Sequence, residues 1–482
     1  RGLGDVYKRQ TSTSVSLACG LAKARDLKGG HENIIAVIGD GSLSGGEAYE
    51  GLSNAGEMGT NLIIVVNDNE MSIAENHGGL YQNLKELRDT EGRSSCNFFR
   101  SLGLDYLYVG EGNDISSLVA AFAKVKDTSR PTVVHIHTQK GKGYAPAEAD
   151  REEFHWEMPF DLETGKPKVD CSGMEDYHSL TGKFLLEKMK EDHTVVAISS
   201  GTPTVIGFTP ERRKQAGRQF VDVGIAEEHA VALASGIAAG GGRPVYGVYS
   251  TFIQRCYDQL SQDLCINGNP AVITVFMGTV AGMNDVTHLG FFDIPLISNI
   301  PNMVYLAPTC SEEYFAMLEW AVRQTEYPVA IRVPGAAVVH RKEEFDTDYS
   351  ELNRYKMTAR GETVAILALG SFYDLGQALK NKLREESGVE ATLINPRYIT
   401  GLDEPMLEEL KVGHRIVVTL EDGVLDGGFG EKIARYYGNS EMRVLNYGLR
   451  KEFADRYNLD ELMKTNRLTD KQMAEDIAGI LE

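Results

Sequence analysis

The chain has 482 residues, a net charge of −20 at pH 7 and a pI near 5.1. Nucleic acids and anionic membranes attract basic surfaces, so this charge excludes both as the main partner, although it leaves room for a local cationic pocket. No apolar run approaches the ~20 residues of a membrane helix, no signal peptide is visible, and the six cysteines form no CxxC pair, which argues against a zinc site or a disulfide framework. With 42% apolar and 24% charged residues, the chain is predicted to be a cytoplasmic α/β protein with about three domains.

The first ten residues, RGLGDVYKRQ, run directly into a Ser/Thr-rich stretch and an Ala-rich helical pattern from Ser16 to Ala24. No start methionine is present, and no element is predicted before that helix. We expect a chain that has lost an N-terminal part, with residues 1–10 a cloning or assembly remnant to be left out of fold reasoning.

Short apolar runs alternate with helical patterns along almost the whole chain. The predicted strands are Ile34–Ile38, Leu62–Val66, Thr132–Ile136, Thr194–Ile198, Val245–Tyr249, Ala271–Phe276, Met303–Leu306, Val329–Val333, Thr363–Leu369, Ala391–Ile394, Arg415–Leu420 and Arg443–Asn446. Helices are predicted between them, among others at Glu47–Gly56, Glu228–Ala239, Glu312–Gln324 and Gly430–Tyr437. The strand candidates are continuous β-branched runs, which is typical of strands covered by helices on both faces. This alternation predicts doubly wound, largely parallel sheets with right-handed crossovers.

Two polar stretches interrupt the alternation, residues 145–178 and residues 340–361. The first is rich in Pro, Glu and Lys and the second is heavily charged, so both are interpreted as interdomain linkers. The predicted fold class is therefore α/β with three domains, near residues 11–165, 176–340 and 355–482.

The strand Ile34–Ile38 ends in the sequence GDGS, residues 39–42, which is followed by two glycines and a helix from about Glu47. Ligands of open α/β sheets bind beyond the carboxyl ends of the strands, where this loop falls. Glycines allow the backbone to approach a ligand closely, and the helix N-terminus offers free N–H groups to a phosphate. Asp40 adds a hard carboxylate, which suits a magnesium or calcium ion that bridges to that phosphate.

The next strand, Leu62–Val66, ends in NDN, and its last residue, Asn69, lies 29 residues after Asp40. Neighbouring parallel strands place their carboxyl ends side by side, so Asp40 and Asn69 can share one cation. The alternative interpretation is a pair of glycine turns with Asx-capped helices.

The segment IGDGSLSGGEAYEGLSNAGEMGTNLIIVVNDNEMSI resembles the diphosphate-binding segment of thiamine diphosphate enzymes, in the form found in the 1-deoxy-D-xylulose-5-phosphate synthase family. The resemblance extends over nearly all of residues 11–482 and includes TSTSVS, KGKGYAPAEAD, FHW, VDVGIAEEHAV, YSTFIQRCYDQ, THLGFFD, LEDGVLDGGFGEK and VLNYGL. It implies a transketolase-like architecture, with a diphosphate-binding domain, a pyrimidine-binding domain and a transketolase C-terminal domain.

For the first domain the resemblance implies a magnesium site and a diphosphate site. The magnesium ligands would be Asp40, Asn69 and the carbonyl oxygen of Met71. Gly41 and Ser42 would line the cofactor's diphosphate, with Lys140 reaching it from the other side, and Gly39 and Asp40 would also belong to the cofactor site. Without the family, Lys140 is equally well interpreted as a solvated loop lysine.

The segment GIAEEH, residues 224–229, places two carboxylates before a small-residue helix. Taken alone, Glu227 and Glu228 are first-turn acids favoured by the helix dipole. The resemblance implies that Glu227 hydrogen-bonds N1′ of the aminopyrimidine and favours the 4′-imino tautomer, whose nitrogen takes the C2 proton of the thiazolium ring. The cofactor would then supply the chemistry, and the protein its orientation and tautomer.

Three further residues are assigned to the cofactor pocket by the resemblance alone. Phe252 would stack on the aminopyrimidine, and Tyr249 and Arg255 would line the same pocket. Aromatic residues at strand ends are otherwise usually part of the core.

His155 and His288 match family histidines that face the reacting carbon, and histidine suits proton transfer near neutral pH. An isolated loop histidine is otherwise more often structural or solvated. His135 and His137 lie on one face of a predicted strand and are interpreted as structural, since no third ligand is evident.

The chain also departs from the family pattern. Gln10 occupies the position of a family histidine, and Met277 that of an arginine upstream of THLG. Asn284 replaces the Asp of the family's Asp-Gly-x-Thr-His, unless Asp285 takes over its role, and Gly335 replaces the second arginine of Arg-Tyr-Pro-Arg-Gly. The family's insertion between Ile73 and about Phe98 is also shortened. The two missing arginines belong to the group that binds the phosphate of glyceraldehyde 3-phosphate. Their loss weakens the case for that acceptor more than the case for the cofactor.

The resemblance implies a homodimeric, magnesium- and thiamine diphosphate-dependent transferase. It would decarboxylate pyruvate and transfer the two-carbon unit to glyceraldehyde 3-phosphate, releasing CO2, for isoprenoid, thiamine and pyridoxal synthesis. Three alternatives stay open: ketol transfer from a ketose donor, a diverged synthase that uses a different or an unphosphorylated aldehyde, and an inactive cofactor-binding paralogue. A nicotinamide-binding dehydrogenase is disfavoured, because the first βα turn reads GDGSLSGG instead of GxGxxG.

Overall fold

The computed structural model describes residues 11–169, 173–335 and 337–481, so the predicted remnant at 1–10, with Gln10, lies outside the described residues. The chain divides into two compact units. Unit 1 runs to Met174 and also includes Ser200–Pro203 and Asp222–Glu227, and unit 2 holds the remainder. Within the described residues, no helix is long and apolar enough to cross a membrane.

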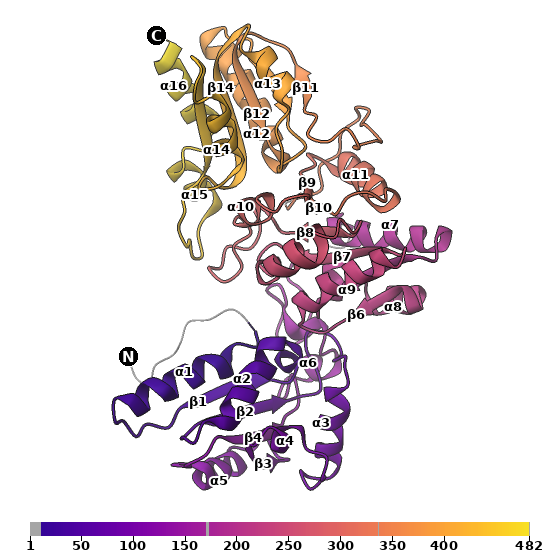
Figure 1. The fold of residues 1–482 in the computed structure, drawn as a ribbon, viewed down its shortest axis with the longest axis vertical. Coiled ribbons are helices and arrows are strands. Elements are labelled where there is room, and N and C mark those ends of the chain that lie inside the picture. Colours follow the sequence, from indigo (N-terminus) through magenta and orange to yellow (C-terminus); the bar gives the residue numbers. More distant parts are fainter. Residues whose placement is uncertain (1–10, 170–172, 336, 482) are drawn as a thin grey trace. The chain divides into compact units, whose positions relative to one another are not determined.

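Unit 1 contains a four-stranded parallel sheet in the order β1-β2-β4-β3 (Figure 1). Its elements are α1 (Ser14–Leu27), β1 (Ile35–Gly39), η1 (Gly41–Ser44), α2 (Gly46–Glu57), β2 (Ile63–Asp68), α3 (Leu80–Asp89), α4 (Phe98–Ser101), β3 (Asp105–Val109), α5 (Ile115–Val125), β4 (Thr132–His137), α6 (Ala145–Ala149) and η2 (Glu153–His155). Helices α1, α2 and α3 share a core with one face of the sheet, and α5 shares a core with the other. This two-sided burial explains the apolar runs IIVV in β2 and VV in β4.

The first sheet of unit 2 has six strands in the order β6-β5-β7-β8-β10-β9, and every described pairing in it is parallel. Its elements are α7 (Tyr177–Glu191), β5 (Val195–Ser199), η3 (Pro203–Ile206), α8 (Pro210–Ala216), η4 (Gly217–Gln219), β6 (Phe220–Asp222), α9 (Glu227–Ala239), β7 (Arg243–Tyr249), η5 (Ile253–Cys256), the π-helix η6 (Gln259–Cys265), β8 (Val272–Phe276), α10 (Asp293–Ser298), β9 (Val304–Leu306), α11 (Ser311–Arg323) and β10 (Val329–Arg332).

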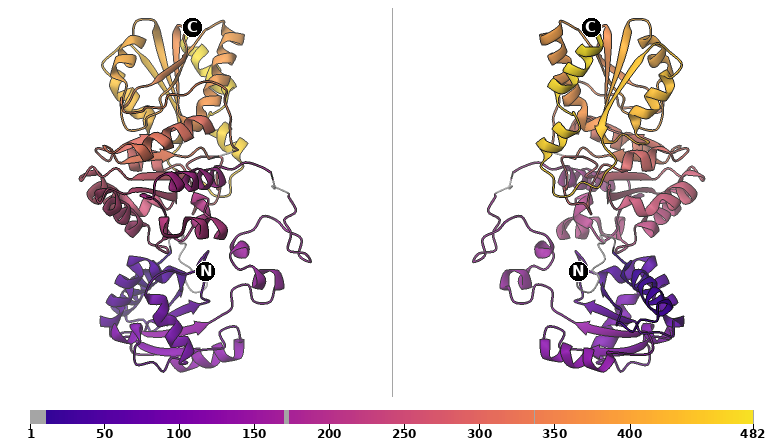
Figure 2. Two further views of the ribbon diagram at one scale, coloured as in Figure 1. Left: turned by 90° about the vertical axis from the view of Figure 1, so that its right-hand side faces the viewer. Right: turned by 90° about the vertical axis from the view of Figure 1, so that its left-hand side faces the viewer.

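The second sheet of unit 2 has the order β11-β13-β12-β14-β15 and is parallel except for the edge strand β11. Its elements are β11 (Lys356–Ala359), β12 (Thr363–Ala368), η7 (Gly370–Phe372), α12 (Tyr373–Ser387), β13 (Thr392–Asn395), α13 (Glu404–Leu410), β14 (His414–Val424), α14 (Phe429–Tyr437), β15 (Arg443–Leu449), α15 (Leu459–Thr465) and α16 (Asp470–Leu481). Figure 2 shows helices on both faces of this sheet.

The predicted α/β class with largely parallel sheets is confirmed, and each of the twelve predicted strands has a counterpart. Three strands were not predicted, namely β3, β6 and β11. β11 falls inside the stretch 340–361 that we interpreted as a linker, so that interpretation is wrong for Lys356–Ala359. Polar residues mask this strand because it lies at a sheet edge, where one side faces solvent. Each predicted domain holds one sheet, while the boundaries themselves stay predictions.

A buried ion cluster joins the two sheets of unit 2. Arg332, at the end of β10, is 4% exposed; its Nε donates to Asp293 at 2.7 Å and its Nη2 donates to the backbone oxygen of Asp422 at 2.6 Å. The hydroxyl of Tyr305 also donates to Asp293. Because Asp422 lies on β14, this cluster fixes the first sheet to the second.

Glu421, the residue before Asp422, caps α14. Its carboxylate accepts hydrogen bonds from the backbone N–H groups of Phe429 and Gly430, each at 2.8 Å. Burial nevertheless raises the pKa of Glu421 from 4.5 to about 7, outweighing those hydrogen bonds and the charges of Arg332 and Lys432. The native state then keeps a proton that the unfolded chain has lost, so this group's contribution to stability is complete below pH 4.5 and is lost as the pH rises through about 7.

We expect the Glu421→Gln variant, which keeps the shape of the protonated acid, to show a flatter stability profile. Between about pH 5 and pH 8 the wild type should lose roughly 2 kcal/mol more unfolding free energy than the variant. Melting temperatures of both proteins across this range measure the difference. Parallel pH profiles would contradict the raised pKa.

Candidate functional site

Two loops meet at the carboxyl edge of the unit 1 sheet. Strands β1 and β2 pair in register with Gly39 opposite Asn67, and the backbone N–H of Asp40 donates to the carbonyl oxygen of Asn67 at 3.0 Å. The backbone of Asn69 also hydrogen-bonds to the Asp40 carboxylate. The structure therefore brings Asp40 and Asn69 together.

Asp40 is 1% exposed, so its charge is costly. Burial, followed by the nearby charge of Asp68, raises the pKa of Asp40 to about 7, while hydrogen bonds from Asn76, Gly41 and Asn69 lower it less. The Asn76 bond, from Nδ2 to the Asp40 carboxylate, is 2.7 Å long. A divalent cation would offset both the burial and the repulsion.

Asp68, beside Asp40, is a buried carboxylate for which the sequence predicted no role. It is fully buried and contacts His135 Nε2 at 2.9 Å as well as the guanidinium of Arg88. Burial alone would raise the pKa of Asp68, but the His135 hydrogen bond and the Arg88 charge outweigh it and lower the pKa. The hydroxyl of Tyr106 lies 2.7 Å from the other ring nitrogen of His135. This chain of contacts keeps Asp68 charged beside Asp40.

The residues at this edge fit a magnesium ion. Asn76 carries a buried side-chain oxygen that has no hydrogen-bond partner among the described residues. Asn69 Oδ1 accepts the N–H of Met71 at 3.2 Å, as the Asx-turn alternative predicts, but an amide oxygen has a second lone pair. Within the described chain, no group of three or more His, Cys, Asp and Glu could hold a metal, so the donors here are a carboxylate, amides and backbone carbonyls. Hard oxygen donors of this kind suit magnesium.

The backbone at Gly41, directly after Asp40, leaves no room for a side chain. A Cβ on Gly41 would lie 2.8 Å from Ser72 Cβ, and the hydroxyl of Ser12 donates to the carbonyl oxygen of Ser42 at 2.7 Å. At Gly39 a Cβ would meet no atom within 4 Å, so the space there is open. A ligand can approach the backbone closely at Gly39.

Lys140 and His155 lie at the same site. Lys140 Nζ donates to the carbonyl oxygen of Ser72 at 2.6 Å, and burial lowers the pKa of Lys140 although the charge of Asp40 opposes this. His155 is on the exposed end of η2, where partial burial and then the charge of Lys140 lower its pKa. Within unit 1, the charge of Asp40 therefore acts on Lys140, and the charge of Lys140 acts on His155.

The segment Asp222–Glu227 belongs to unit 1. The backbone N–H of Ile225 donates to Ser44 Oγ at 2.8 Å, so this segment contacts the end of η1. Glu227 begins α9 and is 3% exposed, which is unusual for a first-turn acid that serves only the helix dipole.

In unit 2, three predicted residues form an aromatic group. The ring of Phe252 meets Tyr249 at 5.5 Å and His288 at 5.8 Å between centroids, in edge-on geometry. Burial raises the pKa of Tyr249. Arg255 lies 3.4 Å from the carboxylate of Glu228, so it is partly neutralised.

Hydrogen bonds within the turn that carries His288 set its tautomer. Thr287 Oγ1 donates to Asp285 Oδ1 and lies 2.8 Å from His288 Nδ1. Because the hydroxyl has one hydrogen, which Asp285 receives, Nδ1 must be the donor of the second bond. A neutral His288 then carries its hydrogen on Nδ1 and keeps the lone pair of Nε2 for accepting a proton. The hydrogen bonds from Thr287 also lower the pKa of Asp285.

Packing accounts for one of the two missing arginines. A Cβ on Gly335 would lie 2.0 Å from Thr279 Cγ2, so no larger side chain fits without a shift. Met277 has a positive φ of 56°. The retained arginine of this motif, Arg332, is buried in its ion cluster.

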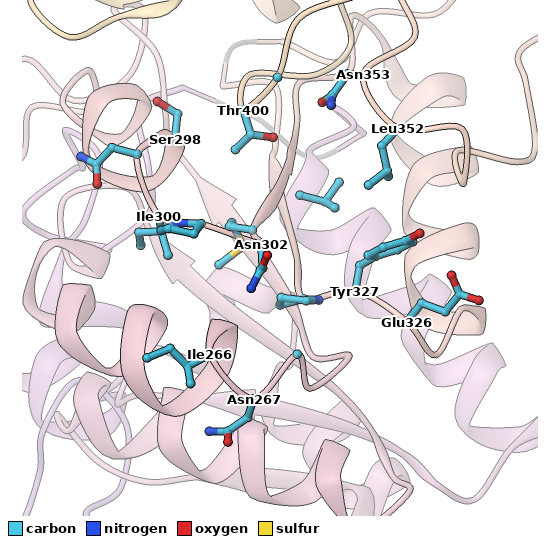
Figure 3. A pocket seen from close by; sticks show the side chains of 17 residues that line it. Ile266, Asn267, Ser298, Ile300, Asn302, Glu326, Tyr327, Leu352, Asn353 and Thr400 are labelled. Atoms are coloured by element: carbon cyan, nitrogen blue, oxygen red, sulfur yellow. The ribbon is translucent and has the colours of Figure 1, made fainter.

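A cavity of about 590 Å³ lies elsewhere in unit 2, next to Met303 and Val304 at the start of β9 and Pro328 before β10 (Figure 3). Its lining includes Asn267, Asn299, Asn302 and Asn353 but none of the predicted site residues. Because it adjoins the amino ends of these strands, it is separate from the carboxyl-end residues Phe252 and His288.

Comparison with known proteins identifies the family of the chain. Three family models match: "1-deoxy-D-xylulose-5-phosphate synthase" at residues 5–97, "Transketolase, pyrimidine binding domain" at 175–338, and "Transketolase, C-terminal domain" at 354–473. A solved transketolase from Pichia stipitis, in complex with sedoheptulose 7-phosphate, aligns with a TM-score of 0.54 at 15% identity, over 97% of this chain and 79% of its own. The fold is thus that of the transketolase-like, thiamine diphosphate-dependent transferases.

Proteins of similar sequence identify the family within this class. A 1-deoxy-D-xylulose-5-phosphate synthase from Clostridium tetani is 35% identical over 98% of this chain and 81% of its own length. One from Lachnoclostridium phytofermentans is 36% identical over 88% of this chain and 73% of its length. The chain belongs to the 1-deoxy-D-xylulose-5-phosphate synthase family.

Proposed function

We propose that this protein decarboxylates pyruvate with thiamine diphosphate and transfers the two-carbon unit to glyceraldehyde 3-phosphate, releasing CO2. The family membership at 35% identity over 98% of the chain carries this proposal. The product would supply isoprenoid, thiamine and pyridoxal synthesis. We further propose a cytoplasmic homodimer whose domains are residues 11–165, 176–340 and 355–482.

In unit 1, we assign the magnesium ion to Asp40, Asn69 and the Met71 carbonyl oxygen. The buried Asp40, the second carboxylate of Asp68 and the unpartnered oxygen of Asn76 support this assignment. The backbone of Gly39, Gly41 and Ser42 and the ammonium of Lys140 would bind the diphosphate.

Thiamine diphosphate, when bound, supplies a nucleophilic carbon that reacts with pyruvate. Glu227 would hold a proton at N1′ of the aminopyrimidine, and Phe252, with Tyr249 and Arg255, would orient that ring. His288 would accept or return a proton through Nε2, the nitrogen that the Asp285–Thr287 chain leaves without hydrogen. His155 is the second proposed proton carrier, and partial burial, followed by the charge of Lys140, lowers its pKa and favours its neutral form.

A specific observation favours a second acceptor. Met277 and Gly335 supply no positive charge, and Gly335 is packed against Thr279. A substrate without phosphate would lose nothing at these positions, so an unphosphorylated aldehyde is the second candidate.

A substrate panel tests the function. With pyruvate, we expect CO2 release to be stimulated more by glyceraldehyde 3-phosphate than by glyceraldehyde, by at least ~10-fold in kcat/KM if phosphate contacts remain. An equal or reversed preference would establish the second candidate. Consumption of xylulose 5-phosphate without CO2 would indicate ketol transfer, and cofactor binding without any turnover would indicate an inactive paralogue.

A further inference from the structure

The turn that carries His288, residues 280–288, is fastened by a short segment near the C-terminus. This segment, Asp455–Tyr457, is named the hook here. Tyr457 Oη donates to the carbonyl oxygen of Val280 at 2.8 Å, and the backbone N–H of Arg456 donates to the carbonyl oxygen of Asn284 at 2.6 Å. Asp455 accepts the N–H of Val286 at 3.2 Å. The hook therefore contacts the turn at three points upstream of His288.

The turn itself belongs to the core of the second sheet. Val280 is 3% exposed, and it shares a hydrophobic cluster with β12 and β14, against which Val286 and Tyr457 also pack. Asp422 on β14 accepts the N–H of Val280 at 2.8 Å. Burial raises the pKa of Tyr457 to about 12, so its hydroxyl remains a donor at neutral pH.

Asn284 makes the contact reciprocal. Its Nδ2 donates to the carbonyl oxygen of Tyr457 at 3.0 Å. A carboxylate at this position could not donate, and its charge would face a carbonyl oxygen. This contact gives a physical reason for asparagine at the position where an aspartate was expected.

We propose that the hook is a positioning element for His288, through which the C-terminal domain holds the reacting histidine in place. The proposal rests on the role given to His288 under the proposed function. The Asp285–Thr287 chain fixes the orientation of the imidazole within the turn, and the hook fixes the turn. Small displacements of a reacting group are costly, because a shift of about 1 Å can reduce rates by up to ~10²-fold.

The Tyr457→Phe variant removes one hydroxyl and tests the proposal in two independent ways. Amide hydrogen exchange in peptides covering residues 277–289 should accelerate. Without the Tyr457 hydroxyl bond to the Val280 carbonyl oxygen the turn opens more often, and the N–H groups of Val280 and Val286 then separate from Asp422 and Asp455. In turnover, kcat should fall about 10-fold while KM for pyruvate stays within about twofold, because binding contacts are untouched. Tyr437→Phe is the matched control, since it removes a hydroxyl that donates to a backbone carbonyl, that of Leu407, at the same 2.8 Å.

Asn284→Asp is a second test variant. It changes an exposed residue and keeps the size of its side chain. It should reproduce both effects. In a His288→Gln background, Tyr457→Phe should cause no further loss of kcat, because the hook acts through His288.

Unchanged exchange in residues 277–289, or faster exchange with unchanged kcat in both variants, would overturn the proposal. An additive loss in the His288→Gln background would also overturn it. If the wild type converts no substrate, the proposed function fails instead, and the exchange experiment still reports whether the hook holds the turn.

Discussion

Replacing Glu227 by glutamine is expected to reduce exchange of the C2 hydrogen of thiamine diphosphate for deuterium by at least ~10²-fold, the scale of a lost general acid–base group. Glu227 is 3% exposed and begins α9, so its carboxyl group is held in a dry environment at a fixed position. Glutamine keeps the shape but cannot share a proton with N1′. Binding of the cofactor should change little, since its other contacts remain.

Glu228→Gln is the matched control, because it makes the same change one residue away on a side chain that faces Arg255 at 3.4 Å. Its exchange rate should stay within about threefold of wild type, since its carboxylate is partly solvated. Exchange is followed by proton NMR after acid quench, and binding by calorimetry. Normal exchange in Glu227→Gln would remove Glu227 from the mechanism.

The parallel sheets could be predicted because strands such as β2 and β4 are buried on both faces and are therefore mainly apolar, with the runs IIVV in β2 and VV in β4. The same reasoning missed β3, whose sequence DYLYV carries an aspartate and two tyrosines. It also missed β11, which lies antiparallel at an edge within a charged stretch. Edge strands need less apolar sequence, so their signal is weak.

The pairing of Asp40 with Asn69 followed from strand spacing and parallel topology, and the structure places the two together. The support around Asp40 could not be predicted in the same way. Arg88 and His135 reach Asp68 from 20 and 67 residues away, and Asn76 reaches Asp40 across 36. Such contacts depend on how α3 and β4 pack in the folded protein, and a local sequence pattern does not predict that packing. The tripeptide NDN contains Asp68, but its sequence predicted only Asn69 as a metal ligand.

Asp40→Asn should have opposite effects on the free protein and on cofactor binding. At pH 8 the ionised Asp40 of the wild type lies buried near the charge of Asp68, so its removal should stabilise the cofactor-free protein by about 2 kcal/mol. The sign follows from the raised pKa: the stabilising contribution of Asp40 is present below its ordinary value of 3.8 and is lost as the pH rises through about 7. The gain in the variant should therefore be small at about pH 4 and largest above neutrality. In the same variant, affinity for thiamine diphosphate with magnesium should fall at least ~100-fold, because the ion loses its charged ligand.

Asp68→Asn is the control with the opposite sign. Asp68 is paired with Arg88 and His135, so replacing it should destabilise the free protein by about 3 kcal/mol, the cost of leaving a buried partner charge uncompensated. Melting temperatures with EDTA, and calorimetric titration with thiamine diphosphate and Mg²⁺, measure both properties. If Asp40→Asn bound the cofactor as tightly as wild type, Asp40 would not be the metal ligand. If the Asp40→Asn variant were less stable than wild type above neutral pH, the destabilisation that we attribute to the burial of Asp40 and its repulsion by Asp68 would be absent. A gain in stability together with a loss of cofactor binding would mean that the Asp40 carboxylate destabilises the free protein and is retained because it binds the metal ion.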